Sequence, residues 1–386
     1  MSSSITNKFI FTLFFGALAM TITHNTYASS DAKQAMKEGK FVNSEIEYKS
    51  HFSGIFKIAK AYMTTERLAP EPNSAVPVLP LTKTELLDLA SDTVFRLGHS
   101  TILMKIDGKF ILIDPVFSER ASPVQWAGPK RFHQSPISIA DLPDIDAVII
   151  SHDHYDHLDK AAIKALDSKV TRYLTPLKVG DHLIDWGVKH DKIIEHKWWQ
   201  TTTVDSLSFT ATPTQHFSGR GVFDRDLTLW ASWVIKGTNS NLFFSGDSGY
   251  FQGFKEIGEK FGPFDITFIE TGAYNEMWSE IHMLPQESMQ AHLDLKGEYM
   301  MPIHNGTFDL ALHDWFEPFK KINDLANEND VNLLTPVFGQ AINVEQLKTQ
   351  TAKHSVNNWW QEMMIAQQNE LGSDGKQTPL QPTTVK

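Results

Sequence analysis

The chain has 386 residues, of which 41% are hydrophobic and 21% charged, a composition typical of a folded globular protein and not of a disordered one. Its 35 Lys and Arg against 46 Asp and Glu give a net charge of −11, which argues against a nucleic-acid partner because the phosphate backbone attracts clustered cations. Cysteine is absent, which excludes disulfides, thiolate metal ligands and a cysteine nucleophile. Any metal site must therefore use His, Asp and Glu.

The first 28 residues are typical of a secretory signal peptide. Lys8 precedes an apolar stretch from Phe9 to Ala19, and a polar region then ends at the small residue Ala28. The apolar stretch is shorter than the roughly 20 residues that span a bilayer. We therefore expect export to the periplasm or cell envelope of a bacterium, with a retained membrane anchor as the alternative.

The remaining chain divides by composition and hydrophobic pattern into three parts. Residues 29–90 are polar with a Pro-rich piece, "APEPNSAVPVLPL", and predict an N-terminal arm. Residues 91–345 carry the regular patterns of one main domain. Residues 346–386 predict a C-terminal extension that is partly disordered, because its last part, "GSDGKQTPLQPTTVK", is almost wholly polar.

Strand patterns alternate with helix patterns along the main domain. Asp107-Gly108 between two apolar runs predicts a hairpin. Strands are expected in 144–150, 206–216, 241–249 and 299–306, and helices in 159–169, in 251–261 and from Pro285, near the first turn, to just before Gly297. This interleaving indicates an α/β layered fold.

The stretch "IISHDHYDHLD", residues 149–159, places three histidines and three aspartates directly after a buried strand. In an extended segment alternate side chains point the same way, so His152, His154 and Asp156 are expected to converge, with His157 turned aside. The turn holds more ligand-type groups than one closed site needs. It therefore indicates a two-metal centre that leaves a position for water.

Three later strands also end in ligand-type residues. His216 ends one strand, Asp247 follows the next in "SGDSG", and His304 follows a third in "PIHNG". Alone, each histidine would be read as a satisfied core or surface residue, and the aspartate as a turn residue. Beside the "HDHYDH" cluster we predict that all three bind metal, because loops at one edge of a sheet are where sites are built.

"SHDHYDHLD" with the later His, Asp and His resembles the metallo-β-lactamase superfamily, whose fold is an αββα sandwich with a di-metal site at one edge of the sheets. "DPVFSERASPVQWAGPKRF" and "HNGTFDLALHDWFEP" are similar to the N-acyl-phosphatidylethanolamine-hydrolysing phospholipase D family and its bacterial relatives. The resemblance implies that one metal is held by His152, His154 and His216, the other by Asp156, His157 and His304, and that Asp247 bridges them.

The same resemblance suggests further site residues. Asp114, in "LIDP", is expected to orient a ligating imidazole by accepting its free N–H, with loop capping as the alternative. His282 is expected to be catalytic, by donating a proton to the leaving group or holding a phosphoryl oxygen. Asp156 is assigned a catalytic role besides its ligand role, and Tyr155 a substrate contact. His99, in "GHST", is expected to be structural.

The activity that the resemblance implies is hydrolysis of N-acyl-phosphatidylethanolamine or a related phospholipid by a di-metal-bound hydroxide. The cofactors are two divalent metal ions, with zinc the first choice and iron or manganese open. The alternatives are a lactonase or other ester hydrolase of the same superfamily, and a non-catalytic, metal-stabilised envelope protein. A homodimer and peripheral contact with a membrane also stay open. Five tryptophans suit either an interfacial surface or the core: Trp126, Trp198, Trp199, Trp230 and Trp233.

Overall fold

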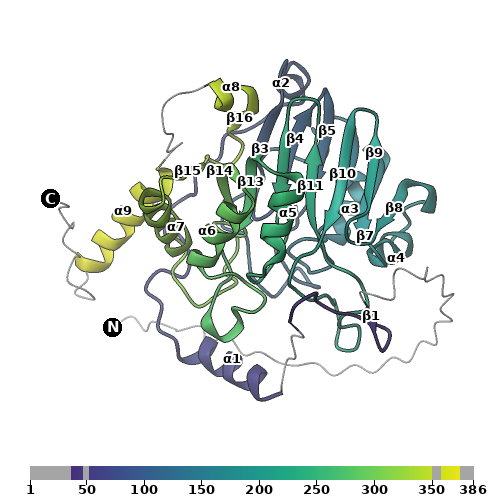
Figure 1. The fold of residues 1–386 in the computed structure, drawn as a ribbon. Coiled ribbons are helices and arrows are strands. Elements are labelled where there is room, and N and C mark those ends of the chain that lie inside the picture. The colour runs from purple at the N-terminus through teal and green to yellow at the C-terminus, as the bar shows by residue number, and fades with distance from the viewer. Residues whose placement is uncertain (1–35, 47–51, 350–357, 374–386) are drawn as a thin grey trace. The chain divides into compact units, whose positions relative to one another are not determined.

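Two mixed β-sheets form the centre of the fold in the computed structural model, which describes residues 36–46, 52–349 and 358–373 (Figure 1). The first has the order β16-β3-β4-β5-β6-β7-β8, with strands Ala341–Asn343, Thr93–Arg96, Ile102–Ile106, Lys109–Ile113, Ile145–Ile149, Val170–Pro176 and Ile193–His196. The second has the order β15-β14-β13-β12-β11-β10-β9, with strands Asn332–Leu333, Gly297–Ile303, Phe264–Glu270, Asn241–Phe244, Ser232–Lys236, Leu207–Thr212 and Thr201–Val204. The expected signal peptide, residues 1–28, lies outside the described residues.

The two sheets share one pattern of strand directions. In the first sheet β16, β3, β4 and β5 pair antiparallel and β5 to β8 pair parallel, and in the second sheet β9 to β12 pair antiparallel and β12 to β15 pair parallel. Parallel neighbours end at the same edge of their sheet. The loops that leave β5, β6, β12, β13 and β14 therefore gather the polar residues that follow those strands.

The hairpin predicted at Asp107-Gly108 joins β4 and β5, with Ile106 paired to Lys109. Both turn residues have positive φ, 50° and 75°, as a two-residue turn between twisted strands requires. The other expected strands and helices are also present, which confirms the α/β reading. The bounds are shorter in places: β10 ends at Thr212, the helix expected in 159–169 ends at Leu166, the helix expected in 251–261 begins at Gly253, and the helix after Pro285 stops at Asp294, so that Gly297 already begins β14.

Three apolar clusters define four layers. The largest lies between the sheets and contains Ile113, Ile149, Phe209, Phe244 and Met301. A second packs α2 (Lys83–Leu87), α3 (Lys160–Leu166) and α4 (Val179–Asp185) on the outer face of the first sheet. A third packs α5 (Gly253–Phe261), α6 (Pro285–Asp294) and α7 (Glu317–Glu328) on the second sheet. The result is the expected αββα sandwich (Figure 1).

The segments around the sandwich are more regular than the sequence patterns indicated. Within the expected N-terminal arm, Met36–Lys37 (β1) and Lys40–Phe41 (β2) form a small hairpin, and Phe52–Thr64 forms helix α1. In the expected C-terminal extension, α8 (Val344–Thr349) precedes α9 (Trp359–Ser373). Of the stretch expected to be disordered, residues 372–386, Gly372 and Ser373 belong to α9, and residues 374–386 lie outside the described residues.

Helix α9 is held by its two tryptophans. Trp359 and Trp360 are buried, and their rings lie 5.4 and 5.9 Å from the ring of Phe319 on α7. Burying two such large side chains is the physical reason that this polar segment is ordered.

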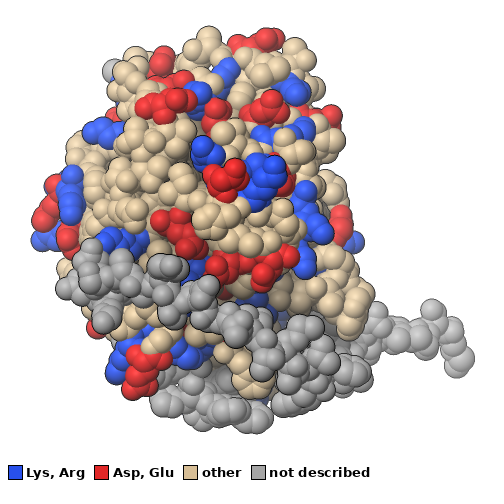
Figure 2. All heavy atoms as spheres, turned by 90° about the vertical axis from the view of Figure 1, so that its right-hand side faces the viewer, with Lys and Arg blue, Asp and Glu red and all other residues tan. Residues whose placement is uncertain are grey.

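Charges are mixed on the face of the molecule shown in Figure 2, where Lys and Arg lie among Asp and Glu without an extended area of either sign. Among the described helices, none is both long and apolar enough to cross a membrane.

Candidate metal centre

The ligand-type residues predicted from the sequence meet at one edge of the sandwich. His152 to His157 follow β6 of the first sheet, and His216, Asp247 and His304 follow β10, β12 and β14 of the second. Their side chains form two groups whose ligand atoms lie within 4.8 Å of one another. The two sheets thus contribute to one site.

The first group consists of His152, His154, His216 and Asp247. The Nδ1 atom of His154 lies 2.9 Å from Nε2 of His152 and 3.2 Å from Nε2 of His216. Both Nε2 atoms lie 3.7 Å from Oδ2 of Asp247. Three imidazole nitrogens and a carboxylate oxygen thus converge on one point.

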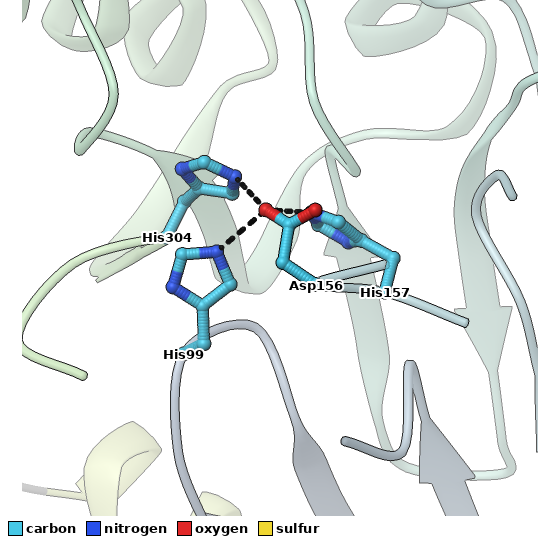
Figure 3. Close-up of side chains that lie close together, drawn as sticks. All are labelled: His99, Asp156, His157 and His304. Atoms are coloured by element: carbon cyan, nitrogen blue, oxygen red, sulfur yellow. Dashed lines mark hydrogen bonds and ion pairs between the residues drawn. The ribbon is translucent and has the colours of Figure 1, made fainter. Parts of the chain in front are cut away.

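The second group consists of Asp156, His157 and His304, together with His99 (Figure 3). Oδ2 of Asp156 lies 3.1 Å from Nε2 of His304 and 3.5 Å from Nε2 of His157. Asp247 also faces this group, because its Oδ1 lies 3.1 Å from His157 Nε2 and its Oδ2 lies 3.0 Å from His304 Nε2. Its carboxylate is therefore shared by the two groups.

These spacings fit a pair of divalent ions. Ligands at 2.0–2.1 Å from a tetrahedral zinc lie about 3.3 Å from one another. The separations within the first group, 2.9 to 3.7 Å, and within the second, 3.0 to 3.5 Å, bracket that value. In addition, His157 Nε2 and Asp247 Oδ1 are buried and lie 3.1 Å apart, yet neither atom forms a hydrogen bond with any of the described residues. Buried polar atoms without partners are costly unless an ion or water completes them.

The grouping of Asp156 corrects the expectation from strand alternation. Residues 154–157 form a turn in which the N–H groups of His157 and Leu158 both donate to the carbonyl of His154, at 3.1 and 2.8 Å. The segment is therefore not extended at this point. Asp156 consequently lies in the group of His157 and not in the group of His152 and His154. This is the grouping that the family resemblance implied.

The imidazoles are oriented by contacts on their far sides. Asp114 is fully buried and its Oδ2 accepts the Nδ1–H of His157 at 2.7 Å, so it lies where the orienting role requires. The same carboxylate accepts the N–H and the Oγ–H of Ser151 at 2.7 and 2.6 Å, and Ser151 Oγ lies 2.9 Å from His152 Nδ1. His216 donates its Nδ1–H to the carbonyl of Ile281 at 3.0 Å.

Burial and neighbouring charges set the protonation of the two groups. Burial lowers the pKa of His152 and His216 well below the ordinary value, which leaves both rings neutral and able to bind a cation. Burial also disfavours the charged form of His304, but the carboxylates, first Asp247, outweigh it and raise the pKa of His304 to about 10. The pKa of His157 is raised for the same reason. A metal entering the second group must therefore displace protons.

His99, expected to be structural, lies inside the second group. It is 1% exposed, its Nε2–H donates to Asp156 Oδ2 at 3.1 Å, and its ring centroid lies 4.0 Å from that of His304. The "GHST" motif close after a strand was the sequence signal that could have indicated this position. His99 is 57 residues from Asp156 along the chain, so no local spacing relates the two residues.

His282 lies beside both groups. Its ring centroid is 5.0 Å from that of His216 and 5.5 Å from that of His304, and it forms a candidate ligand group with Asp247 and His304. Its Nδ1 pairs with the carboxylate of Glu270, a fully buried residue that the sequence analysis overlooked. Burial raises the pKa of Glu270, and the His282 ring opposes that shift.

Tyr155, the expected substrate contact, is engaged with a neighbouring loop. Its hydroxyl donates to the carbonyl of Arg220 at 2.8 Å, and the Arg220 guanidinium lies 4.0 Å from the centre of its ring. Arg220 also donates to the carbonyl of Leu158 at 2.8 Å. These contacts tie residues 217–228 to the turn that carries the ligands.

The family model described as the beta-lactamase superfamily domain matches residues 109–305, about half of the chain, and this span includes every residue of the two groups except His99. The chain belongs to the metallo-β-lactamase superfamily. It is a metal-dependent hydrolase of that superfamily, and it lies near the N-acyl-phosphatidylethanolamine-hydrolysing phospholipases D, to one of which it is 32% identical. The recognition made from the sequence motifs is thereby confirmed.

Curated relatives of this metallo-β-lactamase superfamily member cover most of its length. An uncharacterized protein of Mycobacterium tuberculosis is 42% identical over 288 residues, 71% of this chain and 76% of the relative. The N-acyl-phosphatidylethanolamine-hydrolyzing phospholipase D 1 of Caenorhabditis elegans is 32% identical over 294 residues, 72% of this chain and 83% of the relative.

Solved structures share the fold of this superfamily member. The metallo hydrolase Igni18 from Ignicoccus hospitalis has a TM-score of 0.52 at 19% identity, and covers 66% of this chain and 98% of its own. The isothiocyanate hydrolase from Delia radicum gut bacteria has a TM-score of 0.53 at 22% identity, and covers 65% of this chain and 98% of its own. At these identities the likeness concerns the fold alone.

Proposed function

We propose that this hydrolase is a phosphodiesterase of the phospholipase D type, acting on N-acyl-phosphatidylethanolamine or a related lipid with two divalent metal ions, zinc being our choice. The observation that carries the proposal is the carboxylate of Asp247, which faces imidazoles of both ligand groups at 3.0 and 3.1 Å in one group and 3.7 Å in the other. A shared carboxylate suits two adjacent ions, and such pairs serve displacement at phosphorus. The identity of 32% to a phospholipase D of this kind supports the lipid substrate.

The chain's own residues divide the work. His152, His154 and His216 would hold one ion, Asp156, His157 and His304 the other, and Asp247 both. The ions, when bound, would supply an activated water and would stabilise charge on the phosphoryl oxygens. Zinc suits this site because its ligands are imidazoles and carboxylates.

Two residues are proposed to handle protons. The Asp156 side chain is 16% exposed, against 2% for Asp247, so Asp156 faces the opening of the site and would accept a hydrogen bond from the attacking water. The His282 side chain is 14% exposed and would donate a proton to the leaving oxygen. The water forms a new bond to phosphorus, the bond from phosphorus to the head-group alkoxy oxygen breaks, the alcohol leaves with the proton from His282, and a proton of the water returns to His282.

Exposed apolar side chains favour a lipid over a small soluble ester. Among the described residues, the large apolar side chains that are 80% or more exposed are Met63, Trp126, Val222 and Phe223. The next most exposed, Ile365, is 53% exposed. Keeping such side chains in water is unfavourable, and aromatic residues at loop tips suit the interface of a bilayer.

The segments that carry these side chains adjoin the metal centre. Gly219, in the loop of Val222 and Phe223, donates its N–H to Asp153 Oδ1 at 2.8 Å. Phe132, in the loop of Trp126, donates its N–H to the carbonyl of Thr307 at 2.8 Å. Tyr62, next to Met63, donates its hydroxyl to the carbonyl of Leu310, also at 2.8 Å. We therefore propose that this edge rests on a membrane while the substrate is bound.

Export is part of the same proposal. The composition of residues 1–28, with Lys8 before a short apolar stretch, supports secretion, which would bring the mature protein to the phospholipids of a bacterial envelope.

The test is a joint measurement of metal content and head-group release on the purified protein. With N-acyl-phosphatidylethanolamine in mixed micelles we expect two ions per chain and the release of N-acylethanolamine, and His154→Ala serves as the metal-site control. Two ions without product, but with turnover of bis(4-nitrophenyl) phosphate, would refute the lipid and keep the phosphodiesterase. Turnover of lactones alone would replace the proposal by the ester-hydrolase alternative.

A further inference from the structure

Glu270 occupies a buried position between two of the ligand loops. It is the last residue of β13 and is 0% exposed. β13 pairs in parallel with β12, which leads to Asp247, and with β14, where Glu270 is paired with Ile303 directly before His304. A carboxylate is thus placed at the centre of the second sheet's ligand edge, although it is in neither of the two main ligand groups.

Both ends of Glu270 are held in place. Its backbone N–H donates to Ser245 Oγ at 2.9 Å, and its carbonyl accepts the hydroxyl of Ser288 at 2.7 Å. In the side chain, Oε2 accepts the N–H of Ser248 at 2.7 Å, and Oε1 contacts Nδ1 of His282. The carboxylate therefore has one oxygen fixed by backbone and the other directed at an imidazole.

This contact determines which nitrogen of His282 carries the proton. An ionised carboxylate can only accept hydrogen bonds, so Nδ1 must be the protonated nitrogen that faces it. Among the described residues no group forms a hydrogen bond with Nε2 of His282. The side chain stays next to the ligand atoms of Asp247 and His304, within the 4.8 Å that defines their group. Nε2 is therefore the nitrogen that remains for chemistry.

We propose that Glu270 is a positioning residue, which holds the His282 ring through Nδ1 so that Nε2 is the atom that transfers the proton in hydrolysis. This deepens the proposed function and rests on it for the identity of the reacting bond. Before this step His282 carries a proton on each ring nitrogen. As the bond from phosphorus to the alkoxy oxygen breaks, Nε2–H gives its proton to that oxygen, and a proton of the attacking water then restores Nε2–H. Throughout, Nδ1–H stays hydrogen-bonded to the Glu270 carboxylate, and no proton passes between the two groups.

A purely structural role makes different predictions. Glu270 could serve only to hold Ser248, the residue after Asp247, through Oε2. Its loss would then displace Asp247 and release metal. Glu270→Gln separates the two roles, because the amide oxygen can still accept the N–H of Ser248 while the amide NH2 faces Nδ1. A donor at that place favours the other tautomer, with the proton on Nε2 and a bare Nδ1.

The first experiment reads the tautomer directly, without turnover. In protein labelled with 15N and loaded with Zn²⁺, the His282 ring nitrogens are assigned by comparison with His282→Ala, at pH 8. We expect the neutral ring to carry its proton on Nδ1 in the unaltered protein and on Nε2 in Glu270→Gln, with the same zinc content in both. An unprotonated Nδ1 in the unaltered protein, or an identical spectrum in Glu270→Gln, would overturn the proposal.

The second experiment compares leaving groups. A nitrophenolate departs without help from an acid, whereas an alkoxide does not. In Glu270→Gln the amide NH2 faces Nδ1 and disfavours the doubly protonated ring that acts as the acid. We therefore expect kcat to fall on the order of 100-fold with N-acyl-phosphatidylethanolamine and less than about 5-fold with bis(4-nitrophenyl) phosphate, within the usual range for acid catalysis. In the double variant with His282→Ala the loss should equal that of His282→Ala alone, because the two residues act as one unit.

Glu195→Gln is the matched control, since Glu195 is partly buried and, like Glu270, accepts a backbone N–H, that of Gly180, at 3.0 Å. Equal losses with both substrates, additive losses in the double variant, or lost zinc would assign Glu270 to structure and refute the positioning role. If the unaltered protein cleaves neither phosphodiester, the proposed function fails, and the 15N spectra still decide whether Glu270 sets the tautomer.

Discussion

Asp114→Asn should weaken binding of one metal ion while leaving the fold intact. The Asp114 carboxylate accepts three hydrogens, two from Ser151 and one from His157 Nδ1 at 2.7 Å. Asparagine keeps one acceptor oxygen for the N–H of Ser151 and presents an NH2 group to the imidazole. His157 then places its proton on Nε2, the atom that lies 3.1 Å from Asp247 Oδ1, where a proton prevents metal binding.

The expected size follows from the nature of this contact. Changing the carboxylate that orients a ligating imidazole typically lowers metal affinity about 10- to 100-fold, or about 1.4 to 2.8 kcal/mol. Only the second group contains His157, so the ion held by His152, His154 and His216 should be affected much less. Competition with a chromophoric chelator measures the two affinities separately.

Asp159→Asn is the control for the loss of a nearby buried carboxylate. Asp159 is 7% exposed and accepts the N–H groups of Phe117 and Ser118, at 3.1 and 2.8 Å, but it has no hydrogen bond to an imidazole in the described structure. Its substitution should lower stability and leave both metal affinities unchanged. Two affinities in Asp114→Asn equal to those of the unaltered protein would refute the orienting role.

Three further results are expected. His154→Ala and Asp247→Asn should abolish hydrolysis and lower the metal content measured by elemental analysis, and an active variant of either kind would contradict the ligand assignment. Burial lowers the pKa of His292 to about 4, so its contribution to stability is present above the unfolded pKa near 6.5 and is lost as the pH falls toward 4. His292→Gln should therefore remove about 3 kcal/mol of the loss of stability that the unaltered protein suffers between pH 6.5 and 4. Urea unfolding at pH 7 and 4.5 measures this loss, and an equal loss in the variant and the unaltered protein would show that His292 does not cause it. Replacing Trp126 and Phe223 together by Ser should reduce sedimentation with phospholipid vesicles and spare turnover of bis(4-nitrophenyl) phosphate, whereas undiminished sedimentation would exclude this edge as the membrane contact.

The main features of the fold followed from local patterns. The Asp107-Gly108 turn, the buried run at 144–150 and the strands that end near His216, Asp247 and His304 are all short-range signals, and the structure contains each of them. The motifs also located both ligand groups, because the residues follow strands that end at one edge. These features depend on periodicity and turn chemistry, which a sequence displays directly.

The features that were missed depend on contacts between distant segments. Glu270 is the last residue of an apolar strand, and Asp247 and His304 follow such strands closely. Glu270 reaches the site through its contact with His282, and no spacing in the sequence indicates that contact. His99 joins the site because its turn meets that of His304, whose N–H donates to the His99 carbonyl at 3.1 Å. Helix α9 is ordered by packing on Phe319 of α7, far away in sequence. Tertiary packing of this kind overrides local polarity.

The two ligand groups draw their side chains from both halves of the sandwich, and the carboxylate of Asp247, from the second sheet, faces His152 and His157 of the first. A bound ion would therefore cross-link the two sheets at this edge. Any ligand that binds only the folded state adds to its stability, by about 2.7 kcal/mol at a free concentration 100 times the dissociation constant. The melting temperature should thus rise with the free metal concentration. When a chelator removes the metal, the two sheets should separate first at this edge.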